Sequence, residues 1–183
     1  MASRPLAVFL RAVNLGGRSL KTKPFAESLG LVNLGAAGTF VSFAGIEPKT
    51  LAATVRRKLP FETEVYVCGG EKVLALLRGS PFGPDADAAS VTRFVSILAS
   101  KPKPLPRFPI EEPAGPSWQI RLVGLAGPFA LSLRRPREPR PLYPNAVVEK
   151  RLGVSATTRN WNTIVSLVSL LQPGGDAPRA AKD

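Results

Sequence analysis

Short apolar runs alternate along the chain with helical apolar spacings, and this pattern predicts a mixed α+β protein. A helix opened by Pro24 and another opened by Pro48 are predicted between strands, because proline favours the first turn of a helix. A further helix is predicted at 71–77. The resulting order, β-α-β-β-α-β plus a helix, is that of a ferredoxin-like antiparallel sheet with helices on one face. The strand-like runs are residues 6–10, 31–34, 39–43 and 64–68.

Nearly the same order is predicted again after a turn-rich joint that begins at Ser80. A helix at 145–152 ends at Gly153, and a last helix begins at about Asn160. The place of the first helix in this copy is taken by residues 100–118, whose six prolines predict an extended connection or, alternatively, a docking strip. The strands predicted in this copy are residues 91–98, 117–125, 128–135 and 154–158.

The pattern therefore predicts two tandem ferredoxin-like halves. The boundaries are 1–80 for the first half, 81–90 for a linker, 91–172 for the second half and 173–183 for a disordered tail. No stretch approaches the ~18 apolar residues of a membrane span, and the N-terminal residues lack the features of a signal peptide. A single cysteine, Cys68, excludes an internal disulfide, and its strand-like surroundings predict a buried thiol. We therefore expect a cytoplasmic protein that does not bind a membrane.

Histidine is absent from the sequence, and this excludes several classes of catalytic and metal site. Nucleophilic sites of the Ser-His-Asp or Cys-His kind require histidine, and histidine is the commonest zinc ligand. The carboxylates are scattered without a paired spacing that would suggest acid–base catalysis. We expect no metal and no cofactor. No catalytic residue is identified, so whether the protein is an enzyme stays open.

The net charge of +12 is unevenly distributed. Residues 91–160 hold twelve basic and four acidic residues, which favours a polyanion such as nucleic acid as the partner, although a solvated basic surface explains the charge equally well. Prolines between the arginines of 133–141 predict an extended, exposed segment. Tyr143 follows, either to stack on a base or to anchor the loop. The candidate polyanion-binding residues are Arg134, Arg135, Arg137 and Arg140.

Polar residues also gather where predicted strands end. The first turn of a helix attracts anions, and Arg159 would add a two-pronged donor for a carboxylate or phosphate. In the alternative interpretation Asn160 or Thr158 caps the last helix, Trp161 packs in the core and the other residues are solvated. The candidate ligand-binding residues are Arg11, Asn14, Gly16, Gly17, Arg159, Asn160 and Asn162.

These segments carry a family resemblance. Residues 9–17 read F-L-R-A-V-N-L-G-G, residues 157–163 read T-T-R-N-W-N-T, and the joint contains S-P-F. On these motifs, residues 6–171 resemble the bacterial family called domain of unknown function 1697. The resemblance implies two ferredoxin-like α+β halves and no established activity. Ala12 stands where the family motif has glycine, and residues 35–40 lack the polar residues of the family hairpin, which implies an altered site if that hairpin contributes to one.

Three functional classes remain. The first is a basic binding module for nucleic acid or another polyanion, which the charge of residues 91–160 favours but the scarcity of aromatic residues for base stacking does not. The second is a small-anion binding protein or enzyme that uses the arginine and asparagine residues at strand ends. The third is a structural or partner-binding role.

Overall fold

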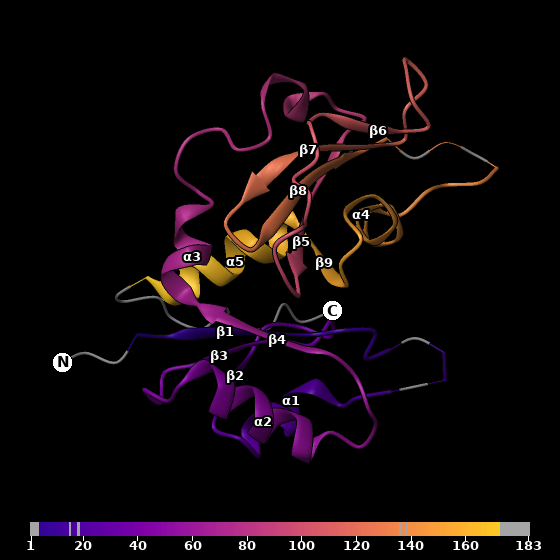
Figure 1. The fold of residues 1–183 in the computed structure, drawn as a ribbon. Coiled ribbons are helices and arrows are strands. Elements are labelled where there is room, and N and C mark those ends of the chain that lie inside the picture. Colours follow the sequence, from indigo (N-terminus) through magenta and orange to yellow (C-terminus); the bar gives the residue numbers. More distant parts are fainter. Residues whose placement is uncertain (1–3, 15, 18, 136, 138, 173–183) are drawn as a thin grey trace. The chain divides into compact units, whose positions relative to one another are not determined.

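A computed structural model describes residues 4–14, 16–17, 19–135, 137 and 139–172 (Figure 1). In this part of the chain the fold is α+β, with two antiparallel sheets and five α-helices, as the pattern of apolar residues predicts. The contacts divide the chain into two units. The first unit comprises Met1–Ala75 with Asn162–Asp183, and the second comprises Leu76–Trp161.

The first unit contains a four-stranded sheet with the strand order β2-β3-β1-β4. Its strands are β1 (Leu6–Leu10), β2 (Val32–Asn33), β3 (Thr39–Ser42) and β4 (Val65–Gly69), and its helices before Asn162 are α1 (Thr22–Glu27), α2 (Pro48–Lys58) and α3 (Gly70–Ala75). Strand β1 pairs with β3 and β4 and is buried along its whole length, which explains its continuous apolar sequence.

Helices α1 and α2 cover one face of this first sheet (Figure 1). Phe40 of β3 packs there with Phe25 of α1 and Val55 of α2, in one apolar core. Helix α2 begins at Pro48, as predicted. Helix α1 begins at Thr22 rather than at Pro24. Because the first N–H groups of a helix have no partner within it, a proline at the third position loses no hydrogen bond.

The second unit contains a five-stranded sheet with the order β6-β7-β8-β5-β9. Its strands are β5 (Thr92–Leu98), β6 (Ile110–Glu112), β7 (Ile120–Ala126), β8 (Phe129–Arg134) and β9 (Ala156–Asn160), with the 3-10 helix η1 (Pro84–Asp87) and the helix α4 (Pro144–Leu152). Helix α4 packs on this sheet through Val147 and Val148. It ends at Gly153, whose φ of 65° is left-handed, as predicted for a glycine that stops a helix.

The proline-rich segment 100–118 contains no helix, but it is not extended connection throughout. Residues Ile110–Glu112 form strand β6, which pairs with β7 at the edge of the sheet. Pro109 and Pro113 flank this strand. Because proline cannot donate to a ladder of hydrogen bonds, it limits β6 to three residues and to an edge position. The prediction of a connection without a strand was therefore wrong at these residues.

The last helix is α5 (Trp161–Leu171), close to its predicted limits. We predicted it as part of a second half at 91–172, whereas the contacts group the residues from Asn162 onwards with the first unit. Leu171 illustrates this grouping, since its Cδ2 lies 3.0 Å from the position that a Cβ on Gly70 would occupy. The predicted tail, 173–183, lies outside the described residues. Among the described helices, none is long and apolar enough to cross a membrane.

Candidate ligand-binding site

Arg11, the first candidate after β1, is held by contacts within the first unit. Its Nη1 atom lies 2.6 Å from Oε2 of Glu64, and the two side chains are 34% and 45% exposed. Thr63 Oγ1 donates a hydrogen bond of 2.6 Å to the carbonyl oxygen of Arg11. These contacts join the end of β1 to the segment that precedes β4. The positive charge of Arg11 therefore already has a carboxylate partner.

Asn14 braces the loop in which it lies. Its Nδ2 donates to the carbonyl of Ala36 at 2.8 Å, and its Oδ1 accepts from the backbone N–H of Leu20 at 3.2 Å. Gly16 and Gly17 are exposed, and their φ angles of 63° and 79° are left-handed. The asparagine thus has a structural use, namely to connect this loop to the hairpin between β2 and β3.

Ala12 also has a left-handed backbone, with a φ of 49°. The left-handed region favours glycine because a Cβ there approaches the following carbonyl oxygen. Arg11, Ala12 and Asn14 therefore form a sharp turn after β1, at a position where glycine would be the unstrained residue.

The second group of candidates lies at the end of β9. Arg159 is only 6% exposed, so the interpretation of this arginine as a solvated surface residue was wrong. Its Nη1 donates to Thr157 Oγ1 at 2.9 Å and to the carbonyl of Thr158 at 3.0 Å. Burial lowers the pKa of Arg159 to about 10. Asn160 is the last residue of β9, directly before α5, and the exposed Asn162 belongs to the first turn of that helix.

Of the four candidate polyanion-binding arginines, two are partly buried and two are exposed. Arg134 is partly buried: its Nε donates to the carbonyl of Leu142 at 2.9 Å, and its guanidinium lies 4.5 Å from the ring centroid of Tyr143. Tyr143 therefore contacts the protein's own arginine, although it remains 61% exposed. Arg137 and Arg140 are exposed. Only these last two present their side chains to solvent as predicted.

Arg135 is the other partly buried arginine, and it lies over an aromatic ring. Its guanidinium is 3.6 Å from the ring centroid of Trp118, and Arg121 lies 4.4 Å from the same ring. Arg121 in turn forms an ion pair with Glu111, with 2.7 Å between Nη2 and Oε1. The tryptophan of this cluster is buried.

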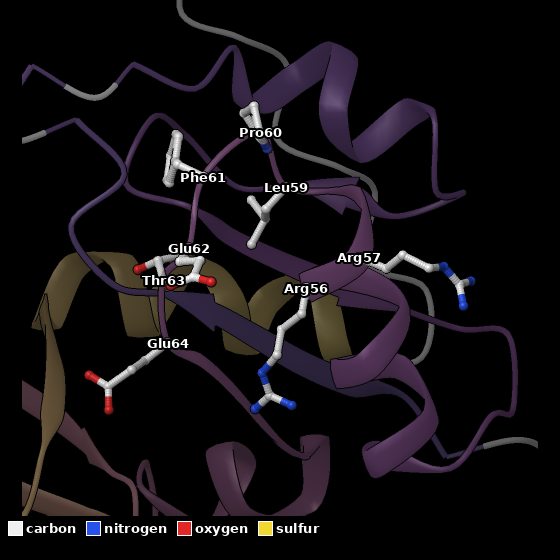
Figure 2. Close-up of a pocket in the computed structure, with 8 residues that line it drawn as sticks. All are labelled: Arg56, Arg57, Leu59, Pro60, Phe61, Glu62, Thr63 and Glu64. Carbon is white, nitrogen blue, oxygen red and sulfur yellow. The ribbon is translucent and has the colours of Figure 1, made fainter.

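A groove of about 910 Å³ lies beside the end of α2 in the first unit (Figure 2). Its charged side chains are used internally, since Arg56 Nη2 donates to the carbonyl of Val65 at 3.2 Å and Glu64 pairs with Arg11. Figure 2 shows Arg57 directed away from the rest of the lining. The lining residues are Arg56, Arg57, Leu59, Pro60, Phe61, Glu62, Thr63 and Glu64, all from one continuous stretch. The groove therefore lies along a single segment of the chain, and its lining includes no polar groups from elements distant in the sequence.

A cavity of about 400 Å³ in the second unit has a different construction. It brings together residues from three separate parts of the sequence around Phe82 and Trp161, whose rings meet edge to face at 5.0 Å. Trp161 is 9% exposed, which confirms the prediction that it is buried. The lining residues are Gly79, Ser80, Pro81, Phe82, Gly83, Pro84, Ala86, Asp87, Arg93 and Trp161, and together they are called the Phe82–Trp161 cavity below.

Arg93 supplies the positive charge of the Phe82–Trp161 cavity. Its guanidinium carbon lies 5.9 Å from the ring centroid of Trp161, and it forms no ion pair within the described part of the chain. Asp87 and Ser80, both exposed, add a carboxylate and a hydroxyl to the lining. An aromatic wall with one uncompensated guanidinium suits a ligand that has a flat apolar part and an anionic group.

The sequence does not reveal this cavity, because its lining comes from segments that are far apart in the chain. In the sequence, the S-P-F joint indicates only a family resemblance, and Trp161 is expected to pack in the core. Arg93 was not singled out, although a lone arginine near the start of the apolar strand β5 was the available signal. Only the fold brings residue 82 to residue 161.

Cys68 and the acidic residues show no sign of metal chemistry in the described ranges. No group of three or more Cys, Asp and Glu side chains that could hold a metal ion occurs among these residues. Cys68 is buried, as predicted, and burial raises the pKa of its thiol to about 12. The thiol is therefore protonated at neutral pH and is a poor nucleophile there.

Comparisons of the chain with protein-family models, curated proteins and solved structures returned no match.

Proposed function

We propose that the second unit binds a small organic anion with a flat apolar part in the Phe82–Trp161 cavity. The observation that carries this proposal is Arg93, a guanidinium without an ion-pair partner in the described chain, beside a buried tryptophan in a cavity of about 400 Å³. Cavities of roughly 300–1,000 Å³ are typical of small-molecule sites. This proposal keeps the small-anion class that the sequence suggests but moves the site to other residues.

Each part of the cavity has a role in this proposal. The fork of Arg93 donates two parallel hydrogen bonds to a carboxylate or phosphate. Phe82 and Trp161 contact the flat part of the ligand, whose apolar surface leaves water. Asp87 accepts a hydrogen bond from a donor on the ligand. No step of bond making or breaking follows from these residues, so the proposal is one of binding.

The test compares two arginines of the same unit. Wild type, Arg93→Gln and Arg107→Gln are titrated by calorimetry with mononucleotides and aromatic carboxylates, after a thermal-shift screen of the same compounds. Arg107 is exposed and does not line the cavity, so it serves as the matched control. We expect Arg93→Gln to bind about tenfold more weakly or worse, because a charge-assisted bond is lost, and Arg107→Gln to bind as wild type does. Equal affinity of all three proteins, or a screen without a ligand, would overturn the proposal.

Binding of nucleic acid or another polyanion is our second candidate function. The observation that favours it is a set of exposed cations on the second unit, which includes Arg137 and Arg140. The proline-rich segment adds the exposed side chains of Lys101, Lys103 and Arg107. Because phosphate contacts release counterions, the affinity of such a surface falls steeply with salt.

Fluorescence anisotropy with a labelled single-stranded oligonucleotide, measured from low to moderate salt, tests this second candidate. Arg137→Ala with Arg140→Ala should reduce the slope of log K against log salt by up to about 1.4, since single strands contribute ~0.7 for each phosphate contact. Lys23→Ala with Lys49→Ala, two exposed lysines of the first unit, is the control for net charge. Undetectable binding at low salt would remove this function. Failure of both candidates would favour the structural or partner-binding role.

We also propose that the chain belongs to the family called domain of unknown function 1697 and that both units are ferredoxin-like. Two observations support this proposal. The strands of the two units have corresponding orders, β2-β3-β1-β4 and β7-β8-β5-β9, with β6 added at one edge. Ala12 has a left-handed backbone where the family motif has glycine. An experimental structure with a different strand order would contradict the proposal.

A further inference from the structure

A second cavity, much smaller than the first, adjoins the cluster around Trp118. Its volume is about 150 Å³. Its lining includes the two guanidinium groups that lie against the indole, Arg121 and Arg135. The full lining consists of Asp85, Ala88, Ser90, Val91, Trp118, Arg121 and Arg135, and it is called the Trp118 cavity below. It shares no residue with the Phe82–Trp161 cavity, so the inference drawn from it does not depend on the function proposed above.

Arg135 has hydrogen-bonding capacity and charge that the described residues do not use. Its Nη2 donates to the carbonyl oxygens of Pro116 at 3.0 Å and Trp118 at 3.1 Å. Within the described residues its Nε is buried without an acceptor, and the guanidinium forms no ion pair with a carboxylate. The charge of Arg135 therefore has no compensating carboxylate in the described part of the chain, and an unpaired buried donor on a charged group is unfavourable.

Arg121 is paired on both sides. Glu111 holds it from β6, with its Oε1 2.9 Å from Nε and 2.7 Å from Nη2. Asp85 pairs with its Nη1 from η1. The two carboxylates differ in exposure: the side chain of Glu111 is 22% exposed and that of Asp85 is 61% exposed. An exposed ion pair is weak, so Asp85 can leave Arg121 at a small cost in free energy.

We propose that the Trp118 cavity is a site for a compact oxyanion, such as inorganic phosphate, sulfate or a carboxylate group. The anion takes the place of Asp85 on Nη1 of Arg121 and compensates the charge of Arg135. Guanidinium groups suit this role because their planar donors match the oxygens of carboxylate and phosphate, and contact with the indole ring restrains their planes. The cavity is well below the ~300 Å³ of sites that hold whole metabolites, so it suits a single anionic group.

The decisive variant is Asp85→Asn, because it removes the competing carboxylate. Inorganic phosphate is titrated into wild type and variant by calorimetry, at constant ionic strength maintained with chloride. We expect Asp85→Asn to bind phosphate about two- to fivefold more tightly than wild type, which is the range that loss of an exposed ion pair corresponds to. A purely structural Asp85 predicts the opposite, namely unchanged or weaker binding. The residue is exposed, and the variant should therefore fold.

Arg135→Gln supplies the second measurement, with Arg137→Gln as its control. Arg137 is an exposed arginine two residues further along the chain. We expect at least a tenfold loss of phosphate affinity in Arg135→Gln and none in Arg137→Gln, because Arg137 lines neither cavity. If Arg135→Gln does not fold, the Asp85→Asn comparison decides alone. Phosphate binding that is undetectable in wild type and Asp85→Asn, or that is equal in them, overturns the proposal.

Discussion

The sheets of the two units are covered in different ways. In the first unit, α1 and α2 both pack on the sheet, and the core between them is aliphatic with a Phe25–Phe40 contact at 5.9 Å. In the second unit α4 lies on the sheet, and the segment between β5 and β7 contains six prolines. Both tryptophans belong to this second unit. Phe108 and Ile110 of this proline-rich segment pack against the apolar core under α4.

Charge also has a different role in each unit. The Arg11–Glu64 pair of the first unit is partly exposed and joins a loop to a strand end. The Glu111–Arg121 pair of the second unit joins directly opposed residues of β6 and β7, and its arginine also contacts Trp118. Some basic residues of the second unit therefore have a structural role. Fewer of them are available to a polyanion than the net charge of this unit suggests.

Among the residues compared, replacement of Trp118 should lower the free energy of unfolding most. Replacement by alanine is expected to lower the free energy of unfolding by about 3–5 kcal/mol, because a large buried ring is removed together with two guanidinium contacts. Trp118→Phe keeps an aromatic face and should lose less than Trp118→Leu. Urea denaturation measures all three variants. Equal stability of the phenylalanine and leucine variants would mean that the arginine contacts contribute nothing.

The two ion pairs provide the next largest difference. Glu111→Gln should lower the free energy of unfolding by about 1.5–3 kcal/mol, because Glu111 accepts from Arg121 and from the backbone N–H of Gly115. Glu64→Gln should lower it by only about 0.2–1 kcal/mol, and the effect should shrink in high salt. Denaturation in low and high salt measures both. Similar losses in the two variants would contradict the distinction drawn between the units.

Two buried titratable groups should respond to alkali in opposite directions. Cys68 is the fourth residue of β4, and Arg159 is the fourth residue of β9. The pKa of the folded Cys68 thiol, about 12, lies above its ordinary 9.0, so between these values the unfolded chain loses a proton that the folded protein keeps. Stability from Cys68 is therefore lost as the pH rises through this range.

For Arg159 the sign is reversed. Its folded pKa, about 10, lies below its ordinary value, so above pH ~10 the unfolded chain binds more protons and stability rises with pH. Each effect is at most about 1.4 kcal/mol per pH unit. The measurement is the difference in unfolding free energy between wild type and Cys68→Ala, and between wild type and Arg159→Met, from pH 8 to 11. Parallel profiles of wild type and both variants would refute the two assignments.

A matched pair of left-handed residues gives the smallest effect. Ala12→Gly should raise the free energy of unfolding by about 1 kcal/mol, because glycine adopts the φ of 49° without strain. Gly153→Ala, at a φ of 65° with no atom within 4 Å of an added Cβ, should lower it by a similar amount. Thermal unfolding of both variants checks the signs. A shift in the same direction for both would show that backbone strain does not control these turns.

Much of the fold was predictable because its signals are local. The apolar run of β1, the proline at the start of α2 and the glycine after α4 act within a few residues, and the structure confirms them. Strand β6 was not predictable in this way, since its three residues become a strand only through pairing with β7. The start of α1 was misplaced because proline is tolerated anywhere in the first turn.

The candidate sites depended still more on the tertiary structure. Composition alone identified the absence of histidine, the single cysteine and the excess of positive charge, because these properties do not depend on conformation. Only the tertiary structure decided which arginine side chains are used within the fold and which can contact a ligand. Arg135 lies against Trp118, Arg159 is buried on β9, and Arg93 lies beside Trp161. A guanidinium is the same chemical group in each place, and only its neighbours in space determine whether its charge is compensated, buried or free to bind a ligand.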